Sequence, residues 1–435
     1  MASATASLQT LLDQLVADGA APGLVASAFT RDGGVFASAA AGHRNASADA
    51  PPMELDSVLW FASSSKPFVS LAVLQVVEKE GFDLDSHEAL AEVVPELRKG
   101  YEGSRVWEVL EGPDAEGNWA SRPAKNGITL RHLLTHTSGI SAPYFSHAGV
   151  WIENNVYPKG FDPNKLMMHN YNVPKNCEAG EAWFYGLNNG WTSLFLMRKT
   201  GLSLRSAVCK LVIEPLGIPP DSMDPYITPS MRSRVVDIAL RNPADGSFFE
   251  FPGGPVYMPQ YEDVPPEGEL ANAEAPMYGT IGVFADFLRS FLFPGGPVNK
   301  EGKPLLSSEM WAQATSDDLK KRGIDIKQGP FMPGAQPMVA AHITNWANKK
   351  IADTASAEGD GEQVFGWSLT QNITDTGLRP GTLEWSGLAN TYYFIDRERG
   401  IGAVISGQFF PWGDAKMLKA RDVFFKWAGE NAPKA

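Results

Sequence analysis

The spacing of apolar residues predicts an amphipathic helix near each end of the chain. Within residues 1–19, one helical face collects Leu8, Leu11, Leu12, Leu15 and Val16. Residues 415–431 form a second helical pattern with a basic face. The first segment has neither the basic start nor the continuous apolar stretch of a signal peptide, so we expect a helix of the fold and a cytoplasmic protein. No run in the sequence is long and apolar enough to cross a bilayer.

Strand patterns lie next to these helices. Residues 23–42 are typical of two strands joined by the turn Asp32-Gly33-Gly34. Three further strand patterns follow one another at 365–372, 382–396 and 401–410. Because neither group has enough partners alone, we expect both to join in one antiparallel sheet.

The middle of the chain alternates between helical patterns and loops. Helices are predicted at 63–81, 188–201, 203–217 and 283–293. The segment 249–278 is rich in proline, glycine and acidic residues, which predicts a lid or a binding loop. The expected fold is α+β. A discontinuous sheet domain would span 1–85 and 350–435, a mostly helical domain would span 86–349, and the active site would lie between them.

Composition and charge narrow the range of partners. The chain has 435 residues, of which 43% are hydrophobic, and a formal net charge of -13. An acidic surface repels nucleic acid and anionic membranes, so neither is an expected partner. The two cysteines, Cys177 and Cys209, cannot form a disulfide framework and lack metal-ligand spacing. We expect no metal and no organic cofactor.

Three consecutive serines stand beside a lysine in the segment WFASSSKPF at 60–68. Ser63 and Lys66 are three residues apart and share a helical face, whereas Ser64 and Ser65 do not face the lysine. A serine becomes a nucleophile when a base removes its proton, and burial favours the neutral amine that can do so. A serine before Lys-Pro is equally a natural helix cap. This segment alone leaves both interpretations open.

Two other segments carry groups suited to catalysis. Tyr185 follows two aromatic residues just before a predicted helix, and a phenol can both donate and accept a proton. The alternative for Tyr185 is an ordinary packed side chain. Trp385-Ser386-Gly387 lies within a strand pattern, where a glycine marks the close approach of another backbone or a ligand.

Together these motifs resemble the serine β-lactamase and penicillin-binding-protein superfamily. They occur in the order Ser63-x-x-Lys66, the tyrosine motif, and the strand-borne W-x-G. The likeness is strongest to class C β-lactamases, related esterases and fungal transesterases of the lovastatin-forming type. The segments LRHLLTHTSGIS, AGEAWFYG and FIDRERG also resemble the fungal group. The likeness extends over nearly the whole chain.

The resemblance implies a β-lactamase-like fold and a role for each motif. Ser63 would form the acyl-enzyme, and Lys66 would hold or accept its proton. Tyr185 would relay protons to the leaving and incoming groups. The backbone N–H groups of Ser63 and Leu388 would form the oxyanion hole.

The sequence departs from class C β-lactamases at two positions. Leu187 stands where those enzymes have the asparagine of Tyr-x-Asn, and Asn188 is one residue out of register. Trp385 replaces the lysine of Lys-Thr-Gly, which helps to bind a substrate carboxylate in that family. Both changes disfavour β-lactam and D-Ala-D-Ala substrates and favour an uncharged ester or thioester.

Aromatic residues are the candidates for substrate contact. Tyr257 and Trp412 match acceptor-contacting aromatic residues of the fungal relative by position, and Trp60 replaces an arginine of that relative. A pocket for a large apolar or aromatic substrate would be lined by these residues together with Trp385, Gly387 and Tyr392. The alternative is that each belongs to the core, as most of the 12 tryptophans must.

Other polar residues have simpler interpretations. His136, in LLTHTSG, is a second candidate base, although a histidine in such a turn is more often a structural hydrogen-bonding residue. We expect His43 and Arg44 to serve packing or ion pairing, and Asp396 and Arg397 to form a turn at the end of a strand.

The leading hypothesis is a fungal serine acyltransferase (transesterase) of secondary metabolism. It would move an acyl group from a thioester or ester donor to an alcohol or amine acceptor. Its partners would be small molecules, with an acyl-carrier protein or a CoA thioester as a candidate donor. A carboxylesterase of the same group is the alternative. A β-lactamase and an inactive scaffold protein are further alternatives.

Overall fold

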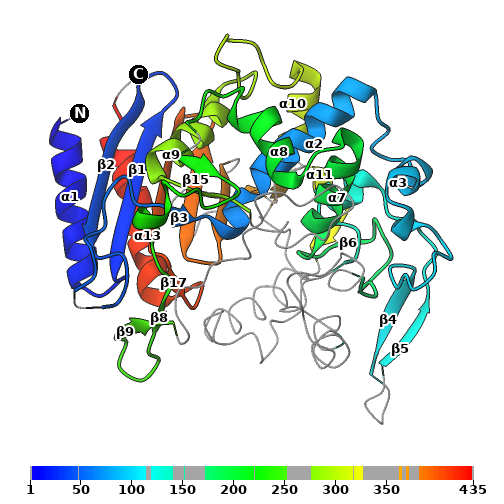
Figure 1. Ribbon diagram of the computed structural model, residues 1–435, viewed down its shortest axis with the longest axis horizontal. Helices are drawn as coiled ribbons and strands as arrows, with labels where there is room; N and C mark the ends of the chain where they lie inside the picture. Colours follow the sequence, from blue (N-terminus) through cyan, green and yellow to red (C-terminus); the bar gives the residue numbers. More distant parts are fainter. Residues whose placement is uncertain are drawn as a thin grey trace.

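A computed structural model shows how these segments assemble (Figure 1). The structure describes residues 2–47, 49–113, 119–140, 151, 172–219, 221–251, 276–316, 318–326 and 382–433, and the backbone of 362–364 and 369–371. The central sheet with its two terminal helices forms one side of the molecule, and most of the other helices form the opposite side (Figure 1).

The central sheet has seven strands and joins the two parts of the chain, as predicted. Its order is β12-β13-β14-β15-β16-β1-β2, and every neighbouring pair is antiparallel. The strands are β1 (Gly23–Thr30), β2 (Gly34–Gly42), β12 (Glu362–Val364), β13 (Leu369–Gln371), β14 (Leu383–Gly387), β15 (Thr391–Asp396) and β16 (Ile401–Ser406). β1 pairs with β16 along its length, from Val25 opposite Ser406 to Thr30 opposite Ile401.

Different helices cover the two faces of this sheet. The helices α1 (Ala2–Ala17) and α13 (Ala415–Asn431) cover one face, and both confirm the predicted terminal helices. The buried cluster on that face includes Leu8, Leu12, Phe36, Phe394 and Phe424. Side chains alternate along β15, so Tyr392 faces the terminal helices while Tyr393 faces the larger core.

The helical part is built around α2 (Lys66–Glu80), which is buried without interruption from Lys66 to Leu74. Pro67 lies in its first turn, and Gly81 ends it in a left-handed conformation with φ of 62°. The other described helices are η1 (Ala62–Ser65), α3 (His87–Val93), η2 (Pro95–Leu97), α4 (Leu130–Leu134), α7 (Asn188–Thr200), α8 (Leu204–Val208), the π-helix η4 (Cys209–Ile213), η5 (Arg232–Arg234), α9 (Ile281–Arg289), η6 (Ser290–Leu292), α10 (Ser308–Ala314) and α11 (Asp318–Arg322).

The helix α9 connects the helical part to the sheet. Phe287 stacks on Phe68 of α2 with ring centroids 3.7 Å apart, and Phe284 meets Tyr393 of β15 edge to face at 5.7 Å. One hydrophobic cluster therefore extends from the sheet through α9 to α2. The division into a sheet domain and a helical domain stays a prediction. The helix α9 falls within the predicted helical domain and packs directly on the central sheet.

Four smaller sheets occur among the described residues, and the sequence pattern did not predict them. They are β3-β10-β7, β11-β6, β17-β8-β9 and β4-β5. Their strands are β3 (Leu59–Trp60), β4 (Glu108–Pro113), β5 (Trp119–Pro123), β6 (Ala182–Trp183), β7 (Met223–Asp224), β8 (Ala239–Arg241), β9 (Phe248–Glu250), β10 (Tyr278–Gly279), β11 (Asp325–Ile326) and β17 (Phe409–Phe410). Most have two or three residues, too few for an alternation to be recognised.

The strand predicted at 401–410 forms as β16, but it is shorter than predicted. β16 ends at Ser406, and Gln408 has a left-handed φ of 49°, which turns the chain out of the central sheet. Phe409 and Phe410 then pair in parallel with β8.

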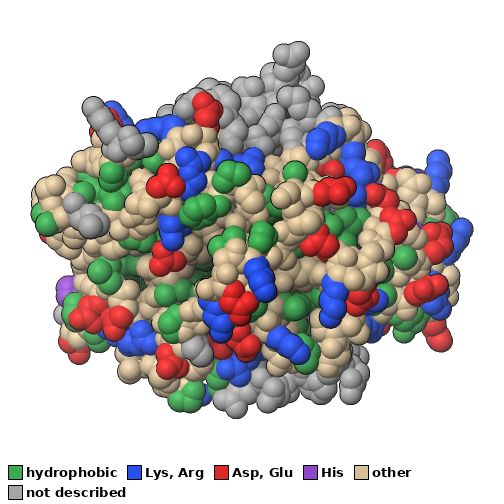
Figure 2. All heavy atoms as spheres, turned by 90° about the horizontal axis from the view of Figure 1, so that it is seen from above, with side chains coloured by type: hydrophobic (Ala, Val, Ile, Leu, Met, Phe, Trp, Pro, Cys, Tyr) green, Lys and Arg blue, Asp and Glu red, His purple; other side chains and the backbone are tan. Residues whose placement is uncertain are grey.

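The surface seen in Figure 2 carries acidic and basic side chains side by side rather than one charged patch among its described residues. No described helix combines the length and apolar character needed to span a membrane. Most of the predicted lid, residues 252–275, lies outside the described residues.

Candidate active site

Ser63 lies on a constrained turn just before α2. The preceding Ala62 has φ of 46°, a left-handed conformation that costs roughly 1–2 kcal/mol for a residue with a side chain. Gly387 at the end of β14 packs against this turn so closely that a Cβ atom there would lie 2.2 Å from the Phe61 carbonyl oxygen. The predicted close approach at the strand glycine is therefore an approach to the backbone of the serine turn.

Lys66 and Tyr185 both reach the Ser63 hydroxyl. Lys66 Nζ lies 3.4 Å from Ser63 Oγ, and the Tyr185 hydroxyl donates to the same atom at 2.8 Å. Lys66 is only 2% exposed, and its Nζ lies 5.1 Å from the centroid of the Tyr185 ring. The structure thus brings Tyr185, which lies 122 residues away in the sequence, to the Ser63–Lys66 pair, with the lysine buried as expected.

Tyr185 owes its position to a short strand and one backbone hydrogen bond. β6 ends two residues before it and pairs in parallel with β11. The Phe184 N–H donates to the His136 carbonyl oxygen at 2.8 Å. The residue before the tyrosine is therefore fixed to the turn that follows α4.

The residues predicted for the oxyanion hole lie at the junction between β14 and the serine turn. Leu388 directly follows Gly387, and the chain then turns through Asn390, which has φ of 58°. The Asn390 side-chain amide donates to the Phe409 carbonyl oxygen at 2.8 Å and so holds this turn in place. The pairing of the Ser63 and Leu388 N–H groups as oxyanion donors stays a prediction.

Two of the predicted substrate-contacting tryptophans lie close to Tyr185 or to the end of β14. The rings of Trp385 and Tyr185 are 5.3 Å apart at an angle of 53°. The Trp412 indole N–H donates to Ser386 Oγ at 3.2 Å. Both tryptophans are half-buried, so each keeps some accessible surface. Their contact with substrate stays a prediction.

Two other predicted pocket residues lie in the core instead. Trp60 is 5% exposed and packs in a buried cluster with Tyr278 and Met231. Tyr392 is on the face of β15 that meets the terminal helices, and its hydroxyl donates to Asn390 Oδ1 at 2.8 Å. Tyr392 therefore faces the terminal helices and not the site. The substrate contact of Trp60 stays a prediction. Tyr257 lies outside the described residues.

Sequence reasoning missed Gln408, which braces the strand before the serine turn. Its side-chain oxygen accepts from the Trp60 N–H and its side-chain nitrogen donates to the Trp60 carbonyl, each at 3.0 Å. No sequence motif marks an isolated glutamine after a strand. Both cysteines are free thiols, and the described residues contain no group of three His, Cys, Asp or Glu side chains that could hold a metal ion.

Comparison with known proteins gives the family of this site. The family model described as Beta-lactamase matches residues 8–424. The chain belongs to the beta-lactamase family. It is 32% identical to the ML-236A carboxylate methylbutanoyltransferase of Penicillium citrinum, over 90% of this chain and 86% of that one. It is 26% identical to a lovastatin esterase of Penicillium rubens, over 97% and 100% of the two chains.

The solved structures agree on the fold of this beta-lactamase-family protein. Unliganded simvastatin synthase from Aspergillus terreus superimposes with a TM-score of 0.72 at 22% identity, over 99% of each chain. The expected α+β, β-lactamase-like fold is thereby confirmed. The similarity to a named acyltransferase and a named esterase also confirms the prediction of an enzyme of acyl-group chemistry. The roles of individual residues stay predictions.

One departure from the beta-lactamase pattern has a clear place in the structure. Asn188, the asparagine that is one residue out of register, is fully buried as the first residue of α7. Its side-chain nitrogen donates to Nδ1 of His136 at 2.8 Å. The amide therefore binds an interior imidazole and does not face a substrate.

Proposed function

We propose that the protein is a serine acyltransferase that works through an acyl-Ser63 intermediate. The observation that carries the proposal is the convergence of Lys66 Nζ and Tyr185 Oη on Ser63 Oγ, at 3.4 and 2.8 Å. A buried amine and a phenol at this distance are the groups that could move protons to and from a serine nucleophile.

Acylation would proceed in two steps, attack of Ser63 Oγ on the donor carbonyl and expulsion of the leaving group. Ser63 Oγ attacks the carbonyl carbon of the donor while Lys66, as the neutral amine, takes the hydroxyl proton. The negative oxygen that develops would be held by the backbone N–H groups of Ser63 and Leu388. The tetrahedral intermediate then expels the thiolate or alkoxide, which takes a proton from Tyr185.

Deacylation would reverse these proton transfers, with the acceptor in place of the leaving group. The acceptor alcohol or amine gives its proton to Tyr185 and attacks the acyl carbon. Ser63 Oγ leaves and recovers its proton from Lys66. Every proton is thus returned, and no cofactor is needed.

The surroundings of the site support an uncharged substrate. The position of the substrate-binding lysine of class C enzymes holds Trp385, whose ring packs near Tyr185 at 5.3 Å. Asn188 is turned into the core and leaves Leu187 at the amide-binding position. An ester or thioester of a small acyl group fits these changes better than a β-lactam with its carboxylate.

The partners follow from this chemistry. The donor and acceptor are small molecules, as the names of the acyltransferase and esterase relatives support. A CoA thioester or an acyl-carrier protein as donor, and cytoplasmic residence, stay predictions of the sequence.

Intact-mass spectrometry after incubation with a short-chain acyl thioester or a p-nitrophenyl ester tests the proposal. We expect one acyl adduct in the parent protein and none in Ser63→Ala. Ser65→Ala is the matched control, because the Ser65 hydroxyl accepts the Met277 N–H at 3.1 Å and has a structural role. An adduct that survives Ser63→Ala, or no adduct with any donor, would contradict the proposal.

Hydrolysis is the second candidate function, and the 26% identity to the Penicillium rubens esterase favours it. Water would then be the acceptor in the second step. Adding candidate alcohols to the acylated protein separates the two functions. Faster loss of the adduct with formation of a new ester indicates transfer, and an unchanged rate of loss indicates an esterase.

A further inference from the structure

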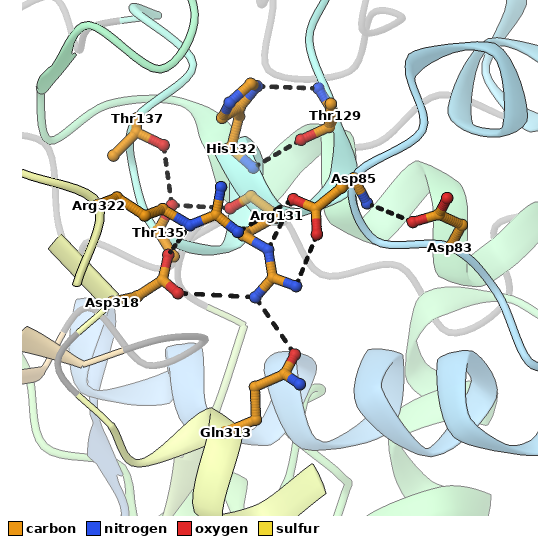
Figure 3. Close-up of polar contacts among 10 residues, drawn as sticks. All are labelled: Asp83, Asp85, Thr129, Arg131, His132, Thr135, Thr137, Gln313, Asp318 and Arg322. Atoms are coloured by element: carbon orange, nitrogen blue, oxygen red, sulfur yellow. Dashed lines mark hydrogen bonds and ion pairs between the residues drawn. The ribbon is translucent and has the colours of Figure 1, made fainter. Parts of the chain in front are cut away.

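Side-chain hydrogen bonds fix both α4 and the turn that follows it. Arg131 of α4 forms two hydrogen bonds with Asp85, at 2.8 and 2.9 Å, and a third with Gln313 at 3.2 Å (Figure 3). The Thr135 hydroxyl, which lies within hydrogen-bond distance of the Thr137 hydroxyl, donates to the Arg131 carbonyl at 2.8 Å (Figure 3). The hydroxyls of Thr135 and Thr137, both drawn in Figure 3, thus lie 2.9 Å apart and bridge the residue between them in the sequence, His136.

His136 itself has a left-handed backbone with φ of 54°. This conformation turns its carbonyl toward the chain that leads to Tyr185, where it accepts the Phe184 N–H at 2.8 Å. The next carbonyl, of Thr137, accepts the Gly180 N–H, also at 2.8 Å. The segment before the catalytic tyrosine is therefore fixed at two points to the turn of His136.

The imidazole of His136 packs against the Tyr185 ring. Their centroids are 4.9 Å apart with the planes at 42°, and His136 is 2% exposed. The Trp183 ring lies edge-on at 6.2 Å. The imidazole is thus part of the wall that orients the phenol.

A chain of hydrogen bonds fixes which imidazole nitrogen carries the proton. The Asn188 amide nitrogen donates to the Ile140 carbonyl at 3.4 Å, which leaves Asn188 Oδ1 to accept the proton of the Ser138 hydroxyl. The Asn188 amide nitrogen then faces Nδ1 of His136 at 2.8 Å, and Nδ1 must accept. The proton therefore belongs on Nε2.

The surroundings of His136 also favour the neutral form of its imidazole. Two titratable groups lie beside the imidazole, the Lys66 amine of α2 and the Tyr185 phenol. Burial lowers the pKa of His136 well below its ordinary value, and Lys66 lowers it further whenever its amine carries a proton. A neutral ring adds no second cation beside the catalytic lysine.

We infer that His136, with its tautomer set by Asn188, is a positioning residue that holds Tyr185 against Ser63. The inference rests on the proposed function of Tyr185 as the proton relay. It accounts for the shift of the asparagine of the tyrosine motif by one residue, because in this chain that asparagine orients the imidazole that supports the tyrosine.

The first test compares two histidines of the same segment. His136→Asn keeps a residue type that tolerates the left-handed backbone but removes the ring. We expect the acylation rate at saturating donor to fall by about 10- to 100-fold, because a misplaced catalytic group loses that much, with little change in KM. His132→Asn is the control, because that half-buried imidazole accepts the Thr129 N–H at the helix start. It should lower Tm and leave the rate unchanged.

The second test does not depend on activity. NMR of protein labelled with ¹⁵N-histidine should show one of the 7 histidines, absent from His136→Asn, protonated on Nε2 and not titrating between about pH 5 and 8. Tyr185→Leu should shift its ring protons by removing the neighbouring ring current. Asn188→Asp, whose carboxylate accepts instead of donating, should move the proton to Nδ1 and slow acylation.

The outcomes separate the two proposals. A parent protein without any acyl adduct contradicts the proposed function, whatever the spectra show. An active parent whose His136→Asn variant acylates at the same rate overturns the inference alone. The inference also fails if the His136 signal shows Nδ1–H or is unaffected by Tyr185→Leu.

Discussion

At the scale of single residues, Ser63, Ser64 and Ser65 are adjacent in sequence but meet different environments. Only the Ser63 hydroxyl lies within reach of Lys66 and Tyr185. Ser64 is fully buried under Gly387, where a Cβ would come within 3.2 Å of its hydroxyl. Ser65 accepts the Met277 N–H. The triple serine therefore combines one candidate nucleophile with two residues that fix its turn.

The role of Lys66 can be tested against Lys175, a second fully buried lysine among the described residues. Lys66→Met keeps the length and removes the amine, and we expect acylation to slow by about 10²- to 10⁴-fold, as for loss of a general base. Lys175→Met is the control, because Lys175 Nζ donates to the Asn126 carbonyl at 3.1 Å and does not touch the site. Stopped-flow measurement of the first turnover gives both rates. Equal rates in Lys66→Met and the parent would refute the base.

The close approach at Gly387 makes a second prediction. In Gly387→Ala, the new Cβ would lie 2.2 Å from the Phe61 carbonyl, so strand and serine turn must separate. We expect at least a roughly 100-fold loss of acylation, because shifts of about 1 Å have that effect on catalytic geometry. Gly282→Ala, at a helical position with no atom within 4 Å of the added Cβ, should keep full activity. A fully active Gly387→Ala would contradict this packing.

The sequence was sufficient to predict candidate catalytic residues that belong to a recognisable motif. The spacing of Ser63 and Lys66, with the resemblance that added Tyr185, predicted the residues that meet in space. It could not predict the partner of Asn188, because that contact joins two segments about 50 residues apart through a left-handed turn. It also placed Tyr392 on the wrong side, because the register of β15 decides which face an aromatic residue meets.

At the scale of secondary structure, the long helices and strands were predictable because their apolar periodicity extends over many residues. The short strands were not, although β6 and β11 determine where Tyr185 stands. A strand of two residues forms because its surroundings offer a partner, and that information is tertiary.

The hydrogen bonds between Arg131 of α4 and Asp85 predict that the stability of the fold depends on pH. The hydrogen bonds from Arg131 hold the pKa of Asp85 below its ordinary value, against the opposing effect of burial. A lowered carboxyl pKa contributes stability above the unfolded value of about 3.9, and this stability disappears as the pH falls through the folded pKa. We expect Asp85→Asn to be less stable than the parent by roughly 1 kcal/mol at pH 7, since the carboxylate is partly exposed.

Urea unfolding at pH 7 and at about pH 3 measures this difference. The gap between parent and Asp85→Asn should shrink toward zero at the lower pH. Asp286→Asn, which removes an exposed pair with Arg289 at 3.6 Å and 62% side-chain exposure, should show little change at either pH. A gap that widens in acid would show that the Asp85 carboxylate does not stabilise the fold.

At the scale of the whole molecule, the terminal helices pack on the face of the sheet opposite the cluster that contains α2 and α9. Phe424 of α13 is fully buried there, and Phe424→Ala should cost about 3–5 kcal/mol of stability. Val423→Ala, at 38% exposure on the same helix, should cost far less. Acylation at a temperature where both variants are folded should match the parent. A slower reaction in Phe424→Ala would mean that the two faces are coupled.

The pairing of β1 with β16 has a consequence for how the protein is made. Val25 leaves the ribosome long before its partner Ser406, on the order of 20–80 s earlier at ordinary elongation rates. Until then one edge of the early hairpin has no neighbour, and such an edge invites aggregation. Gly387 and Leu388 also emerge long after Ser63, so the nascent chain should acquire the packed turn of Ser63 only after both have been synthesised.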